Sequence, residues 1–229
     1  KHFGKPSGLM DQLACAVGGF VAIDFEQPEQ PKIEKIDCDL SALGYGICIV
    51  NCGGNHADLT HEYAAVTKEM GDVARFFGKT VLREVDEAAF YASLGQLRKS
   101  VSDRALLRAM HFFGDNARVP KQAEALKQHD IETFRHLMNE SGHSSFTLLQ
   151  NVCPTDVSER GLALALALSE RMLAGKGAWR VHGGGFAGTI LALVPLRDMS
   201  DYQAQMEKVF GQGCCYRFAV RPVGGVKIG

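Results

Sequence analysis

The feature that most constrains this chain is a long helical middle between two strand-rich ends. Apolar residues recur every three or four positions over residues 62–77, 105–128, 131–149 and 154–173, with a weaker helical pattern over 87–96. Strand-like runs precede this region at 20–25, 32–37 and 45–50, and others follow it at 178–182, 189–194 and 215–220, with one more helical pattern at 201–210. Paired strands at both ends of a helical insertion predict an α+β fold rather than a doubly wound parallel sheet. Pro120 predicts a kink or break in the second helix.

Composition excludes several classes of protein. The 229 residues are 46% hydrophobic and 22% charged, which is typical of a globular chain. A net charge of -1 without a basic cluster gives no reason to expect nucleic acid. No apolar run approaches the ~20 residues of a membrane span, and no secretory signal occurs, so we predict a cytoplasmic protein without a membrane partner. The chain begins at Lys1 without a methionine, as a fragment or processed protein would.

The cysteine and histidine patterns predict no metal site. The seven cysteines are odd in number, have apolar neighbours and include no Cys-x-x-Cys pair. Disulfide frameworks and zinc sites need regular pairs, so we expect reduced thiols. The eight histidines likewise show no ligand spacing.

An acid stands where the first helix should begin. In residues 5–12, Asp11 follows a Pro-Gly turn that includes Gly8. Backbone N–H groups and the dipole at a helix start favour an ionised carboxylate there. One interpretation is a catalytic carboxylate that accepts a proton, and the other is an acid that only caps its helix.

A glycine-dense loop follows the strand at 178–182. It contains Gly183, Gly184, Gly185, Phe186 and Gly188. The loop matches G-x-G-x-x-G, but a strand rather than a helix follows it, which argues against a dinucleotide site. It is either a plain hairpin turn or a place where backbone approaches a ligand.

Tyr63 lies at the start of the helical pattern over residues 62–77. An aromatic residue at helical spacing belongs more often to a core than to a ligand site. A phenol with an apolar ring and one polar tip also suits contact with a ligand, so both interpretations stay open.

Taken together, three segments resemble the galactokinases, in the wider GHMP family that also contains homoserine and mevalonate kinases. They are Gly8-Leu9-Met10-Asp11-Gln12, the loop from His182 to Thr189, and the stretch from Asn51 that ends in His61-Glu62-Tyr63. The Asp11-Gln12 pair and the Glu62-Tyr63 pair favour galactokinase over the other two kinases. Residues 224–228 also resemble that family's C-terminus.

The resemblance implies a fold in two parts. Residues 43–229 would form a GHMP-kinase C-terminal domain, with two layers, a ferredoxin-like antiparallel sheet and inserted helices. Residues 1–42 would be a remnant of the N-terminal kinase domain that carries the Asp11 helix and a hairpin. Because the partner strands of that remnant are missing, we expect Phe20, Ile23 or Phe25 to form an exposed apolar face that invites self-association.

The resemblance also implies an ATP-dependent sugar kinase. Asp11 would act as base on galactose or a related sugar, Gly8 and Tyr63 would bind that sugar, and the glycine loop would lie beside the nucleotide. ATP and Mg²⁺ are expected for the whole family.

The sequence departs from the family pattern in ways that affect activity. Ala187 replaces a glycine of the loop, and Ser7 replaces a cysteine. The family's Gly-Glu-His-x-Asp sugar motif, its assisting arginine and its Ser-rich phosphate loop do not occur in this sequence. We therefore expect the chain alone to be inactive or nearly so, and active when the missing half is present. The alternative is a non-catalytic module that senses a sugar or binds a partner.

Overall fold

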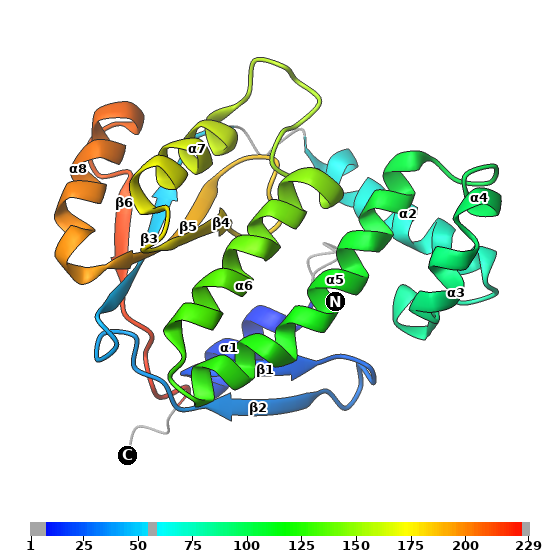
Figure 1. Cartoon of the computed structure of the whole chain (residues 1–229), viewed down its shortest axis with the longest axis horizontal. Coiled ribbons are helices and arrows are strands. Elements are labelled where there is room, and N and C mark those ends of the chain that lie inside the picture. The colour runs from blue at the N-terminus through cyan, green and yellow to red at the C-terminus, as the bar shows by residue number, and fades with distance from the viewer. Residues whose placement is uncertain (1–7, 55–58, 226–229) are drawn as a thin grey trace.

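The computed structural model describes residues 8–54 and 59–225 (Figure 1). Residues 5–7, 55–56 and 226–228, which contribute to the sequence motifs above, lie outside these ranges. The helices are α1 (Met10–Val17), α2 (Thr60–Phe76), α3 (Glu87–Ala92), α4 (Leu94–Leu97), α5 (Asp103–Lys127), α6 (Ile131–Ser144), α7 (Gly161–Leu173) and α8 (Met199–Phe210). The strands are β1 (Phe20–Asp24), β2 (Lys32–Ile36), β3 (Tyr45–Asn51), β4 (Ala178–Val181), β5 (Thr189–Pro195) and β6 (Cys215–Phe218).

The main sheet is antiparallel, with the strand order β4-β5-β3-β6. Its longest pairing joins β3 to β5, from Tyr45 opposite Pro195 to Asn51 opposite Thr189. A separate two-stranded sheet pairs β1 with β2. The predicted α+β class with an antiparallel sheet is therefore confirmed. The separate hairpin falls within residues 1–42, but the domain boundary itself stays a prediction.

Helices cover both faces of the main sheet. On one face α7 and α8 bury β-strand residues that include Cys48, Val50, Ile190 and Ala192. On the other face, Met138 of α6 packs with Ala178 and Leu193, together with Ile36 of the hairpin and Leu126 of α5. Helices α5 and α6 thus pack against both the main sheet and the hairpin. Figure 1 shows the hairpin below these two helices.

Several helices begin where a polar side chain satisfies a free backbone N–H group. Asp86 accepts from Ala89 at the start of α3, Ser102 from Ala105 at the start of α5, and Asp130 from Thr133 at the start of α6. Such caps contribute about 1 kcal/mol each. The weak pattern at 87–96 resolves into two short helices, α3 and α4.

Most element boundaries lie within two residues of the sequence prediction, but two helices differ by more. The helix expected from 154 begins only at Gly161, because Asp156 accepts hydrogen bonds from the backbone and hydroxyl of Ser158 and holds a turn there. The helix expected over 131–149 changes at Ser145 into a single π turn. The last strand ends at Phe218 rather than at 220.

The break or kink predicted at Pro120 does not divide α5, which continues from Asp103 to Lys127. Phe113 packs into one apolar cluster before the proline, and Ala123 and Leu126 pack into another after it. We attribute the continuity to this packing, which offsets the ~3 kcal/mol that an interior proline costs a helix.

The hairpin exposes less apolar surface than expected. Phe20, Ile23 and Phe25 are all partly buried, and Phe20 packs against the cluster that contains Ile36. The physical reason is α5, which covers one face of β1 and β2. The larger exposed apolar side chains of this region are instead Leu9 and Met10, at 54% and 61% exposure, with Ile33 at 39%. Among the described helices, none is long and apolar enough to cross a membrane.

Candidate functional site

Asp11 lies in the first turn of α1 and is exposed to solvent. The position before the helix is occupied by Leu9, so Asp11 is not the capping residue that one interpretation made it. Gly8, which precedes α1, is also exposed. The carboxylate of Asp11 is therefore accessible to a ligand.

The glycine loop joins β4 to β5 and requires glycine at several positions. Gly183, Gly185 and Gly188 have positive φ, and Phe186 does as well at 62°. A side chain on Gly185 would place its Cβ atom 2.1 Å from the backbone oxygen of Asn151. Left-handed backbone at a residue such as Phe186 costs about 1–3 kcal/mol and persists only where surrounding contacts impose it.

Tyr63 supplies one of those contacts. Its hydroxyl donates a hydrogen bond of 2.9 Å to the backbone oxygen of Gly185. Its ring meets the buried ring of Phe186 edge to face, with centroids 5.4 Å apart. Burial raises the pKa of the Tyr63 phenol. The structure therefore brings Tyr63 and the glycine loop together, as both interpretations of this residue allow.

Asn151 holds the same loop from the other side. Its side-chain amide donates to the backbone oxygen of Gly184 at 3.1 Å, and its own backbone oxygen accepts from Phe186 at 2.5 Å. Asn151 is 3% exposed. Sequence reasoning missed this residue because it is 33 positions away from the loop.

His182 lies between β4 and the three glycines of the loop. Burial and the nearby Arg180 lower the pKa of the His182 imidazole, and the carboxylate of Asp11 acts in the opposite direction. Asp11 is thus close enough to the start of the glycine loop to influence a group there. His182 Nδ1 lies 3.0 Å from the hydroxyl oxygen of Thr189. The loop motif begins at His182, although the sequence predicted no role for this residue.

Glu62, next to Tyr63, is a buried acid at 4% exposure. It accepts a 3.1 Å hydrogen bond from the backbone N–H of Thr155 and another from the Thr155 hydroxyl. Burial opposes its ionisation, but these hydrogen bonds outweigh that effect, so the pKa of Glu62 is lowered. The Glu62–Thr155 contact separates two cavities.

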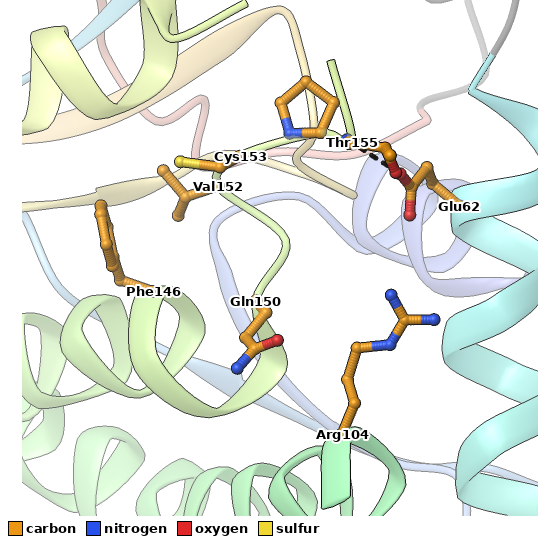
Figure 2. Close-up of a pocket in the computed structure, with 8 residues that line it drawn as sticks. Glu62, Arg104, Phe146, Gln150, Val152, Cys153 and Thr155 are labelled. Carbon is orange, nitrogen blue, oxygen red and sulfur yellow. Dashed lines mark hydrogen bonds between the residues drawn. The ribbon is translucent and has the colours of Figure 1, made fainter. Parts of the chain in front are cut away.

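The cavity on the loop side has a volume of about 220 Å³ and includes Phe186 and Ala187 in its wall. The other has a volume of about 310 Å³ and is drawn in Figure 2. Glu62, Pro154 and Thr155 line both. Within the described ranges, no group of three histidine, cysteine or acidic side chains is placed to hold a metal ion.

The chain is similar in sequence to known galactokinases. The galactokinase of Glaesserella parasuis serovar 5 is 31% identical over 202 residues, which cover 85% of this chain and 48% of that protein. The Bos taurus galactokinase is 32% identical over 194 residues, covering 83% of this chain and 45% of that protein. The chain spans about half the length of the curated relatives it matches. No protein-family model matches the chain.

Solved structures share the fold. The Lactococcus lactis galactokinase complexed with galactose superposes with a TM-score of 0.74 at 20% identity, covering 98% of this chain and 57% of that one. The L. major mevalonate kinase in complex with R-mevalonate gives a TM-score of 0.56 at 14% identity, with 97% and 55% covered. The fold is that of the GHMP kinases, in the α+β form of their C-terminal domain. Within that class, the chain is related to the galactokinases and resembles a C-terminal portion of them.

Proposed function

We propose that this chain forms the part of a galactokinase-like enzyme that positions the sugar hydroxyl for transfer of the γ-phosphate of ATP to galactose or a related sugar. The relation to galactokinases supports the reaction class. The observations that support the residue assignment are the exposed position of Asp11 in the first turn of α1 and the hydrogen bond from the Tyr63 hydroxyl to Gly185 of the glycine loop.

In this proposal Asp11 accepts the proton of the sugar hydroxyl. The exposed position of Asp11 in the first turn of α1 leaves its carboxylate accessible to that hydroxyl. Phosphoryl transfer tolerates a weak base because its transition state is loose. Gly8 and Tyr63 would contact the sugar, while the backbone of Gly183 to Gly188 would lie beside the nucleotide.

The residues described do not themselves fit ATP and Mg²⁺. They include no cluster of acidic ligands for a metal ion, and the sequence lacks the family's Ser-rich phosphate loop. We therefore assign phosphate and metal binding to residues outside this sequence and derive no step through them. The complete activity requires a polypeptide equivalent to the unmatched half of the relatives.

A chimera tests this proposal. In it, the chain replaces the matched part of the Glaesserella parasuis galactokinase, and galactose-dependent release of ADP is measured. Asp11→Asn should lower kcat about 10²–10⁴-fold, as loss of a general base does. Asp201→Asn is the matched control, because Asp201 is also an exposed acid in the first turn of a helix, α8.

Two results would decide against the proposal. Equal losses in both variants would mean that the acids act only on helix stability. A folded chimera that binds galactose in a calorimetric titration without releasing ADP would favour the sugar-sensing alternative.

A further inference from the structure

The larger cavity lies across the Glu62–Thr155 contact from the glycine loop. It opens where α2, the first turn of α5 and the segment after α6 meet, and its volume is about 310 Å³. That volume lies at the small end of the ~300–1,000 Å³ typical of ligand pockets. Figure 2 shows Arg104 reaching from α5 toward the space between Gln150 and Glu62, with Phe146 on the opposite wall.

Hydrogen bonds to other residues hold the charged side chains of this cavity wall in place. Arg104 Nε lies 3.1 Å from both carboxylate oxygens of Glu69, and a second guanidinium nitrogen lies 2.5 Å from one of them. Arg108, fully buried, donates to the same carboxylate at 3.0 Å and to the backbone oxygen of Leu149 at 3.1 Å. Glu62 is fixed by Thr155. Preorganised polar groups of this kind lose little freedom when a ligand binds.

The charges of this network balance. Two arginines, Arg104 and Arg108, are matched by two carboxylates, Glu62 and Glu69. Arg104 is the cation of the cavity wall, and Glu62 is its acid. An anionic ligand would meet Glu62, and a cationic ligand would meet Arg104, so the cavity favours a neutral ligand that both donates and accepts hydrogen bonds.

The backbone departs from regular structure at this wall. The π turn Ser145–Leu149 continues α6, and Gln150 follows it in the left-handed conformation at φ 59° and ψ 41°. Phe146 of this turn is 45% exposed and lines the cavity together with the exposed Gln150. π turns and left-handed residues other than glycine are frequent at functional sites.

We propose that this cavity binds a small, neutral, polyhydroxylated ligand of monosaccharide size. Its C–H face would pack on the Phe146 ring. Its hydroxyls would hydrogen-bond to the Gln150 amide, the Arg104 guanidinium and the Glu62 carboxylate, which together supply donors and acceptors. This site uses neither Asp11 nor the glycine loop, so it does not depend on the proposed kinase function.

The test is a titration of the intact chain with D-galactose, D-glucose and myo-inositol, followed by NMR of the Gln150 side-chain amide and the Thr155 backbone amide. We expect at least one of the three to bind and to shift both signals. Phe146→Ala should weaken binding at least about tenfold. Phe218→Ala is the matched control, since Phe218 is another half-exposed ring, at 51%, on β6.

Gln150→Gly separates binding from folding. Glycine accepts the left-handed backbone at position 150, so stability should hold or rise while the ligand loses its amide contact. We expect binding to weaken several-fold in a variant whose unfolding midpoint is not lowered. Asp11→Asn should leave this binding unchanged.

Four outcomes would overturn the proposal. The first is that none of the three polyols binds. The second is that Phe146→Ala and Gln150→Gly bind as the unaltered chain does. The third is that citrate or inorganic phosphate binds more tightly than every polyol. The fourth is that Asp11→Asn abolishes sugar binding whereas the two cavity variants do not. That result would place the sugar at the proposed substrate site and would leave the kinase proposal standing.

Discussion

The glycine loop and helix α1 carry the two halves of the proposed site, yet they are held in different ways. The loop is fixed by Tyr63, Asn151 and the buried ring of Phe186. Helix α1, in contrast, has no buried residue among its eight. We infer that buried contacts within this chain fix the geometry of the loop, whereas α1 is held less firmly.

The largest effect on stability should come from adding a side chain at Gly185 in the glycine loop. Gly185→Ala should destabilise the chain by about 3 kcal/mol or more, because the new Cβ atom would meet the Asn151 backbone at a position with φ of +80°. Urea unfolding measures this. Gly183→Ala is the matched variant, with φ of +69° but no atom within 4 Å of its Cβ, and should cost about 1–2 kcal/mol. Equal costs would mean that contact with Asn151 does not fix the loop.

A smaller effect is expected from the hydroxyl of Tyr63. Tyr63→Phe removes the donor to the Gly185 oxygen while it keeps the ring on Phe186, so we expect a loss of about 1–2 kcal/mol in urea unfolding. Tyr216→Phe, at a half-exposed tyrosine on β6, should have almost no effect. Loss of the same size in both variants would argue against a role for this hydrogen bond in holding the loop.

The smallest effect on stability should come from a substitution in α1. Met10→Ala should change the stability of the chain by no more than about 0.5 kcal/mol, because Met10 is 61% exposed. Leu162→Ala, at 3% exposure in α7, should cost about 2–5 kcal/mol in the same urea unfolding experiment. A large effect at Met10 would show that α1 is already packed, and the contrast drawn between the two regions would fail.

The sequence predicted the elements whose patterns are local. Amphipathic spacing located α2, α5 and α6, and apolar runs located the strands. An element with one buried face carries apolar residues at regular intervals in the sequence, so it can be predicted from the sequence alone. The turn at 154–160 was missed because Asp156 and Ser158 bond locally in place of a helix. The π turn was missed because a single widened turn leaves no change in the apolar pattern.

The candidate site was predictable only where motifs marked it. Asp11, Tyr63 and the glycines were named from their sequence context, and the fold brings Tyr63 to the loop over 122 positions of chain. The residues whose contacts fix the geometry of the site do not belong to a sequence motif. Asn151 and the Glu62–Thr155 contact depend on tertiary packing, and no spacing in the sequence indicates them.

The most direct measurement is an NMR titration of His182 in the unaltered chain and in Asp11→Asn. Burial holds the pKa of His182 below its usual value, and the Asp11 carboxylate partly offsets that effect. His182 therefore binds its proton less readily in the folded than in the unfolded chain, so its contribution to stability is present above the unfolded pKa and is lost as pH falls below it. Because Asp11→Asn removes the negative charge, the account predicts a further decrease in the pKa of His182, with no such decrease in Asp201→Asn. An unchanged pKa in Asp11→Asn would contradict the claim that this carboxylate faces the glycine loop.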